Sequence, residues 1–349
     1  MANRYWVGGD GNWSDDDNHW ATVSNGSPSD GNLPTFADSA IVDEYSGTTS
    51  NSITLDVEAN CLDLILSDSG PRIAGEAPLY GGTINIYGSL IGGKNMTQQF
   101  NGTVYFKSTS TGKTVSFGSY QSMSLNIVFD GIGGGWTFND GASFGFLSSV
   151  TTLTLTNGSL NINGENLQLK NIVSNNSNVR TLSLGDAEIT LKGTGTVLDF
   201  EDSTNLTFNA GTSLFITTNE SGSVIKPGGK TFYNISFIQN AQIIGGNGTY
   251  NSITFAPAKS YVLGAGYLQT ISNLLAEGTS GNLITFNSDS AGTMWKISSG
   301  TTSVRYCSVK DSWAQGGAAP FDNTNGGVDR GNNIGWNFRK MPFPISRRV

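Results

Sequence analysis

The sequence has few of the residues on which common enzymes and metal sites depend. There is one histidine, His19, in 349 residues, and there are two cysteines, Cys61 and Cys307. Two thiols this far apart cannot form a disulfide framework or a four-thiolate zinc site, so we expect both to be buried as small apolar residues. A histidine flanked by Asp17 and Trp20 is more typical of a packing residue than of a catalytic triad. The sequence therefore predicts no cofactor, no zinc centre and no histidine-dependent catalysis.

Charged residues are also scarce, at 13% of the chain, and the net charge is −8. A protein that binds nucleic acid needs a basic face, so we expect no nucleic-acid partner. No apolar run reaches the length of a membrane span, and residues 1–7 lack the cationic start and apolar core of a signal peptide. We therefore predict a soluble chain without membrane insertion.

The sequence is rich instead in short apolar runs that alternate with polar residues. Eight triplets have apolar outer residues around a mostly polar middle residue, which is the period of a half-buried strand. They begin roughly 7 to 15 residues apart, as expected for many short strands joined by tight turns. The 46 glycines and the low charge leave little room for long amphipathic helices. The triplets are 153–155, 160–162, 167–169, 182–184, 189–191, 198–200, 206–208 and 214–216.

These patterns predict an all-β fold, a parallel β-helix or β-solenoid in which short strands pair with the coils before and after them. Similar segments around Phe208, Phe237, Phe255 and Phe286 are unevenly spaced. Uneven spacing fits stacked coils with irregular turns better than propeller blades of fixed length. A β-sandwich with fewer and longer strands, or a string of small β-domains, is the alternative.

Three regions differ in composition. Residues 1–44 are dense in Trp, Asp, Asn and Pro and predict a small Trp-rich, turn-rich cap, because the glycines between the tryptophans exclude a helix. Residues 45–338 carry the strand pattern and form the predicted solenoid body. Residues 339–349 are an irregular basic tail, in which two prolines block strand pairing and four basic residues gather.

Both ends of the sequence resemble a known class of proteins. The stretches that carry the resemblance are RYWVGGDGNW at 4–13, GNLITF at 281–286, VRYCSVKDS at 304–312 and GNNIGWNF at 331–338. They look like virion proteins of tailed bacteriophages, in which Gly-, Asn- and Thr-rich parallel β-helix chains serve as fibres, spikes or decoration proteins. The resemblance implies a virion location, contacts with capsid or tail proteins, a homo-oligomer that is commonly a homotrimer, and for some members contact with a host-surface glycan.

Either end of the chain is a candidate for attachment to a particle. The cap offers aromatic area that a neighbour would bury, and the tail offers positive charge for an acidic neighbour. The sequence does not decide between them. The candidates in the cap are Tyr5, Trp6, Trp13 and Trp20, and those in the tail are Arg339, Lys340, Arg347 and Arg348.

Paired carboxylates are the remaining route to catalysis. Two Asp or Glu residues about 5 to 10 Å apart can hydrolyse a glycosidic bond. Neighbouring outward positions on a strand share a face, so the candidate pairs are Asp199 with Glu201 or Asp202, and Asp186 with Glu188. Carboxylates on a solenoid surface more often keep it soluble and protect its edges, and we expect that role here.

Three further motifs favour structure over ligand binding. The acidic segment 10–18 suggests a calcium loop, but its sixth position is Asp15 instead of Gly, so an irregular calcium site and an Asx-rich turn are both open. Trp136, Trp313 and Trp336 could stack on sugars, although end caps and core fillers are the commoner roles of such rings. The Gly-rich segment 131–135 lacks the Lys and Ser/Thr of a phosphate loop.

We therefore expect a non-enzymatic structural protein of a tailed phage, displayed on the head or tail surface as a fibre, spike or decoration. The alternative is a tailspike that binds a host receptor or degrades host polysaccharide.

Overall fold

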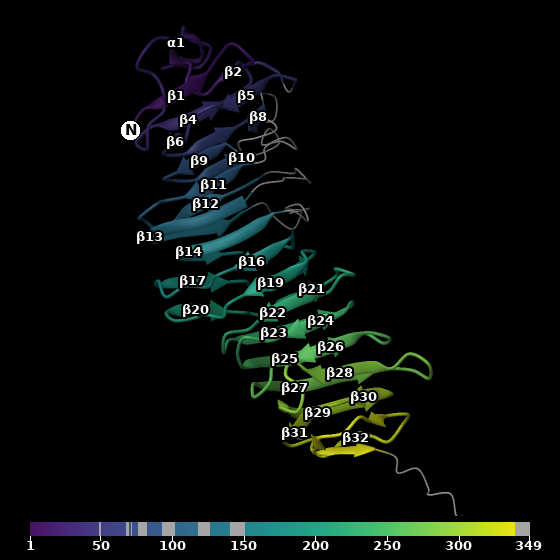
Figure 1. Cartoon of the computed structure of the whole chain (residues 1–349). Coiled ribbons are helices and arrows are strands. Elements are labelled where there is room, and N and C mark those ends of the chain that lie inside the picture. Colours follow the sequence, from purple (N-terminus) through teal and green to yellow (C-terminus); the bar gives the residue numbers. More distant parts are fainter. Residues whose placement is uncertain are drawn as a thin grey trace, which may run out of the picture. The chain divides into compact units, whose positions relative to one another are not determined.

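The computed structural model of the chain is almost entirely β, with strands in 53% of residues and helix in about 1%. It describes residues 1–48, 50–67, 70, 72–75, 82–92, 102–117, 126–139 and 151–338. Short strands stack in parallel, one coil on the next, as a parallel β-solenoid (Figure 1). The predicted fold class is therefore confirmed. The predicted basic tail, residues 339–349, lies outside the described residues.

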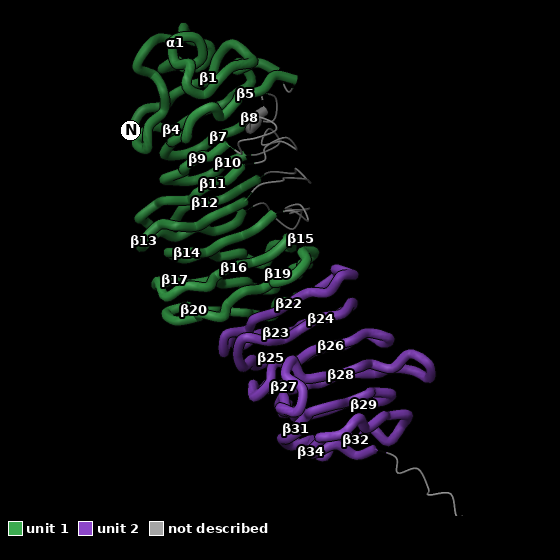
Figure 2. The backbone as a smooth tube through the Cα atoms, in the orientation of Figure 1, with its two compact units in different colours: residues 1–216 green, residues 217–349 purple. Residues whose placement is uncertain are grey.

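The chain divides into two compact units, residues 1–216 and 217–349 (Figure 2). The predicted boundaries at residues 44 and 338 follow composition and stay predictions. Strands from the predicted cap pair directly with strands of the body, so the first unit contains both. In the described part of the chain, no helix is long and apolar enough to cross a membrane.

Three parallel ladders form the sides of the coils in unit 1. In each ladder, equivalent strands of successive coils lie in register. Ladder A holds β1 (Asn3–Trp6), β4 (Ser39–Val42), β7 (Leu64–Leu66), β10 (Leu90–Gly92), β12 (Lys113–Val115), the second halves of β13 (Asn126–Phe138) and β14 (Thr152–Asn161), β17 (Arg180–Ser183) and β20 (Leu206–Asn209). Ladder B holds β6 (Ala59–Cys61), β9 (Thr83–Ile86), β11 (Thr103–Phe106), the first halves of β13 and β14, β16 (Asn171–Val173) and β19 (Gly195–Asp199).

The third ladder of unit 1, ladder C, is described in two pieces. The first contains β2 (Gly11–Asn12), β5 (Ser52–Leu55) and β8 (Arg72–Gly75). The second contains β15 (Leu167–Leu169), β18 (Glu188–Leu191) and β21 (Leu214–Thr217). The short helix α1 (Asp16–His19) and β3 (Trp20–Ala21), which is antiparallel to β1, complete the first coil.

Inward side chains stack along the ladders and fill a narrow core. Ala40, Leu64, Leu90, Val115 and Phe138 occupy one position on five successive coils and are fully buried. Parallel strands lie about 4.8 Å apart, so each side chain packs on its equivalent in the next coil. Burying each larger apolar side chain contributes about 1.5–3 kcal/mol, which explains why alternation is kept although coil length varies.

Unit 2 contains two parallel ladders, one of short strands and one that includes longer strands. One ladder holds β22 (Ser223–Lys226), β24 (Ala241–Ile243), β26 (Ser260–Leu263), β28 (Ile284–Ser288), β30 (Cys307–Val309) and β33 (Val328–Asp329). The other holds β23 (Thr231–Phe237), β25 (Gly248–Phe255), β27 (Leu268–Glu277), β29 (Trp295–Arg305), β31 (Ser312–Gln315) and β34 (Asn333–Ile334). A separate pair joins β32 (Phe321–Asn323) to β35 (Trp336–Phe338).

Long strands in unit 2 turn a corner without ending. In β27, Ile271 and Leu274 are buried, while the two residues between them, Ser272 and Asn273, both face outward. Two consecutive outward residues reverse the alternation and bend the strand, so one long strand supplies two sides of the coil.

Most of the sequence triplets lie on strands with the predicted face inward, but one was assigned the wrong face. In the triplet 214–216, the middle residue Phe215 is buried and the outer residues Leu214 and Ile216 are half-exposed. Ser213 and Thr217 share the inward face with Phe215. Because side chains alternate, a one-residue shift moves all of them to the other face.

The repeated Phe segments do not mark one structural position. Phe237 and Phe255 pair in register and stack at 5.4 Å between ring centroids. Phe286 lies instead on β28, in the other ladder of unit 2, and Phe208 lies on β20 of unit 1. Local sequence similarity therefore reflects similar turns and strands on different sides of the coil.

Candidate functional site

The first coil is closed by tryptophans that point into the core. Trp6, Trp13 and Trp20 are 0%, 1% and 0% exposed. The antiparallel pairing of β1 and β3 places Trp6 opposite Trp20, and the Nε1–H of Trp20 donates to the carbonyl of Trp13 at 2.9 Å. Trp20 also packs edge-on against both other indoles, at 5.2 and 4.8 Å. The cap therefore covers the end of the core with apolar rings, and the N–H groups of Trp6 and Trp20 donate to the carbonyls of Gly9 and Trp13.

His19 belongs to the same cluster. Its ring stacks on Trp6 at 4.4 Å, and its Nδ1 lies 2.7 Å from the carbonyl of Val7. This agrees with the packing role expected from the sequence. The two cysteines are also free and buried as expected, and burial raises the pKa of both thiols, at Cys307 to about 12.

The candidate attachment residues fall into three situations. The three cap tryptophans are buried, so their rings are not available as contact surface, whereas Tyr5 is half-buried on the outer face. The four candidates in the tail, Arg339, Lys340, Arg347 and Arg348, lie outside the described residues. Attachment through either end stays a prediction.

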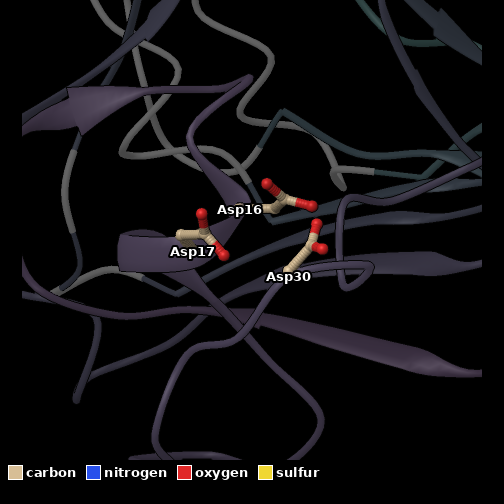
Figure 3. Close-up of side chains that lie close together, drawn as sticks. All are labelled: Asp16, Asp17 and Asp30. Carbon is tan, nitrogen blue, oxygen red and sulfur yellow. The ribbon is translucent and has the colours of Figure 1, made fainter.

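Three carboxylates gather beside the cap. Asp16 and Asp17 come from α1 and Asp30 from the loop after β3, and one oxygen of each lies within 4.8 Å of the others (Figure 3). Such oxygens suit Ca²⁺ or Mg²⁺, with water completing the coordination shell of either ion. Asp16 is also engaged by the backbone N–H of Gly31 at 2.9 Å.

This cluster differs from the predicted acidic loop. Within segment 10–18, only Asp16 and Asp17 contribute to it. Asp10 accepts hydrogen bonds from the side chain of Asn51 and the backbone of Ser52, and Asp15 accepts from Asn18. The segment therefore supplies Asx-type turn contacts as well as two of the three clustered carboxylates.

A groove crosses a corner of unit 1 where three successive coils differ in length. Asp130 pairs with Asn157, and Gly135 pairs with Ser159. Between these two pairs β13 advances by five residues and β14 by only two. The extra residues 131–134 and, on the coil after β14, residues 174–179 bulge beyond the shorter middle coil. The trough between them has a volume of about 570 Å³.

The lining of the groove is neutral. Ile132 and Val179 stand on opposite walls, and each is 77% exposed. Amide and hydroxyl groups of Asn157, Ser159 and Asn178 lie between them. Arg180 is the one charged residue among the lining residues, and it is 1% exposed.

Glycines lower the floor of the groove. Gly158 has φ +81°, and a Cβ there would lie 2.6 and 2.7 Å from the carbonyl oxygens of Gly131 and Gly134. Any larger residue would therefore clash with backbone as well as adopt a strained φ. A Cβ at Gly134 would meet the ring of Trp136 below.

The buried guanidinium of Arg180 fixes one wall of the groove. It donates to the carbonyls of Ser174 and Asn178 in its own coil, and to those of Asp202 and Thr204 in the next coil, at 2.7–2.9 Å. Its Nε also donates to the Ser174 hydroxyl at 2.7 Å. Burial lowers its pKa, yet these acceptors keep the cation satisfied.

The predicted carboxylate pairs lie on the surface, and Asp202 is next to the groove wall, because its carbonyl accepts from Arg180. Asp186, Glu188, Glu201 and Asp202 are exposed, and Asp199 is half-exposed. None of them lines the groove. The side-chain and backbone groups of Thr204 hydrogen-bond to Asp202 and hold its pKa below the usual value.

The three candidate sugar-stacking tryptophans also separate. Trp136 is 2% exposed, so its role as a core filler is confirmed. Trp336 is half-buried, and its Nε1–H donates to the Ser312 hydroxyl at 2.9 Å. Trp313 is 40% exposed, with the ammonium of Lys296 5.7 Å from its ring centroid.

Comparison with known proteins identifies no relative: no family model, no curated protein and no solved structure matches the chain.

Sequence reasoning missed the groove, Arg180 and Asp30. A buried arginine looks like any surface arginine in sequence, and its partners are carbonyls that any residue supplies. The groove depends on unequal corner lengths, which the run Gly131-Ile-Gly-Gly-Gly135 indicated only as a turn.

Proposed function

We propose that the chain is a non-enzymatic structural protein of a tailed bacteriophage, displayed on the head or tail surface as a fibre, spike or decoration and assembled as a homo-oligomer. The observation that carries the proposal is the parallel solenoid: within each unit, backbone ladders join successive coils and apolar side chains fill the inside. Such a body suits a stiff spacer because bending it would open ladders and core together. The link to a virion rests on the resemblance of the end motifs.

The described carboxylates support a role without catalysis. Glycoside hydrolysis needs a general acid with a raised pKa. Five described carboxyls have a lowered pKa; hydrogen bonds outweigh the opposing effect of burial at Asp38, and dominate at Asp202, Glu277, Asp311 and Asp322. Such groups are ionised at neutral pH and serve as hydrogen-bond acceptors.

The test is to look for the chain in particles. We expect mass spectrometry of purified virions from the encoding phage to detect it, and immunogold labelling to place it at a regular position on the head or tail. Its absence from intact, infectious particles would overturn the proposal. Counting copies per labelled site would test the homo-oligomer.

The groove favours a second function, recognition of a neutral glycan on the host surface. Its apolar walls and neutral amide and hydroxyl groups match the C–H faces and hydroxyls of a sugar chain. We expect saturable binding to host cells or purified polysaccharide, weakened by Val179→Arg, which fills the trough, and unchanged by Val57→Arg, an exposed control outside it. Equal binding by both variants would exclude the groove.

Cleavage is measured in the same assay as new reducing ends. Cleavage that Asp199→Asn abolishes would replace the structural proposal with a polysaccharide-degrading spike.

A further inference from the structure

An apolar stripe runs along the outer face of the first four tiers of ladder A. Tyr5 pairs with Ile41, Ile41 with Ile65, and Ile65 with Ile91, so these residues hold one outward position on β1, β4, β7 and β10. The first three are half-buried and Ile91 is 46% exposed. At about 4.8 Å per tier, this outer stripe is about 14 Å long.

The rest of the same ladder carries polar outward residues. Thr114 and Thr137 pair in register on β12 and β13, and Asn161 and Ser183 pair in register on β14 and β17. Single exposed apolar residues are ordinary, but four in register on an otherwise polar face indicate a surface that a partner covers.

Carboxylates flank the outer stripe on both sides. Asp63 lies in the corner before β7 and Asp43 in the turn after β4, and both are half-buried. Asp43 accepts hydrogen bonds from the Ser24 and Ser46 hydroxyls and from the backbone N–H of Tyr45. Asp63 accepts the backbone N–H of Ser89 at 2.6 Å. Among β1, β4, β7 and β10, the one basic residue is Arg4, beside Tyr5; it is half-buried and its guanidinium donates to the side chain of Asn32. A self-complementary contact would bring like charges together, so the stripe suits an apolar segment with basic flanks.

The chain itself contains such a segment. Residues 339–349 read RKMPFPISRRV, with Met341, Phe343 and Ile345 between two basic pairs. At about 3.1 Å per residue for an extended proline-rich chain, residues 341–345 match the length of the stripe. We propose that the basic tail of one chain docks on the outer stripe of a second copy.

The stripe belongs to unit 1 and the tail to the part of the sequence assigned to unit 2. A tail from a second copy can meet the stripe whatever the arrangement of the two units within one chain, so we take a second copy as the source. Docking of the chain's own tail is the outcome that the test below separates from it. The contact is heterologous, so it joins copies head to tail in a ring or a row. This inference is independent of the proposed virion role.

The test uses the full chain in sedimentation equilibrium over a wide concentration range. We expect concentration-dependent association that weakens at least about tenfold when salt is raised from about 0.05 to about 0.5 M, because charge pairs are screened. A chain that stays monomeric throughout, as docking of its own tail would produce, overturns the proposal.

Charge substitutions at the exposed end of the stripe locate the contact. Ile91→Lys should weaken association more than Ile91→Glu, since the lysine also repels the tail. In the Arg347→Glu/Arg348→Glu background this order should reverse. Asn139→Lys, an exposed change on a later coil, is the control and should have no effect.

A second variant covers the case in which Ile91→Lys does not fold. If Ile91→Lys alters the circular dichroism spectrum, Phe343→Asp tests the same contact by a change in the tail. Association of every variant at the wild-type level would overturn the proposal, because the copies would then meet through another surface.

Discussion

The two ends of the described chain bury their aromatic residues to different extents. At the first coil, Trp6, Trp13 and Trp20 are at most 1% exposed. At the last coil, Trp336 is only half-buried and Ile334 is 51% exposed. The difference follows from the chain path, because α1 and β3 fold across the first coil, whereas β34 and β35 are themselves the last described rungs. A solenoid core needs a segment outside the coil pattern to shield its end.

In the last coils, polar side chains form hydrogen bonds with the backbone, whereas the first coil is packed with indole rings. The side chain of Asn323 is buried and exchanges two hydrogen bonds with the backbone of Cys307, at 3.2 and 2.9 Å. Asn333 donates to the carbonyl of Val309 at 2.8 Å. Amide side chains thus replace ladder bonds where strands are only two or three residues long.

We expect the largest difference in stability between the two ends when a tryptophan is removed from each. Trp20→Ala should lower the free energy of unfolding by about 3–5 kcal/mol, because it leaves a cavity among buried rings. Trp336→Ala should cost markedly less, since that ring is already partly hydrated. Urea denaturation followed by circular dichroism measures both. Equal losses would mean that the last coil is as well shielded as the first.

Two glycine substitutions compare the packing of the two ends through smaller losses of unfolding free energy. A Cβ at Gly11 would collide with the buried ring of His19, whereas nothing lies within 4 Å of a Cβ at Gly331. We expect Gly11→Ala to cost about 1–3 kcal/mol through overpacking. Gly331→Ala should cost about 1–2 kcal/mol, from its φ of +94° alone. A larger loss at Gly331 than at Gly11, by the same denaturation assay, would contradict a tightly packed first end.

Acid should loosen both ends of the described chain, through carboxyls whose pKa is lowered by hydrogen bonds. The side chain of Asn332 and the backbone N–H of Gly292 donate to Asp311 and hold its pKa below the usual value. An aspartate with a lowered pKa stabilises the folded state fully at pH values above about 3.9, the pKa of Asp in the unfolded chain. This stabilisation is lost as the pH falls through the lower pKa of the folded state. Hydrogen exchange should therefore quicken around residues 306–334 in that window, and also at Ala2 and Thr35, whose backbone N–H groups donate to Asp38, a second carboxyl with a lowered pKa.

Asp311→Asn is the control for this prediction. It should remove that part of the pH dependence and weaken the last coils already at neutral pH. An unchanged acid response in the variant would assign the loosening to other carboxyls, such as Asp322, whose pKa is also lowered by hydrogen bonds from Thr324.

The strands could be predicted because each inward stack repeats a local alternation. The alternation from Leu153 to Leu155 is enough to predict which face of the strand is buried. The face of Phe215 could not be read this way, because its inward neighbours Ser213 and Thr217 are polar and the apolar Leu214 and Ile216 lie outside. The geometry of the coil decides which polar residues face the core, and local hydrophobicity does not predict it.

The sites were less predictable than the fold. Trp6, Trp13 and Trp20 indicated a cap, but their spacing did not reveal that β1 and β3 pair antiparallel and turn all three rings inward. Arg180 acts on carbonyls from two coils, which no short motif encodes. The outer stripe is similarly spread over residues 5–91 and becomes visible only once the register is known.

Unequal corners give this solenoid freedom to change its surface. Leu153 pairs with Ile127, 26 residues earlier, and with Ile172, 19 residues later, yet all three side chains face the core and are nearly fully buried. An insertion or deletion at a corner is absorbed there and leaves the alternation of the flanking strands intact. A corner can therefore gain or lose residues, and with them a groove or a contact surface, without any change in the core sequence.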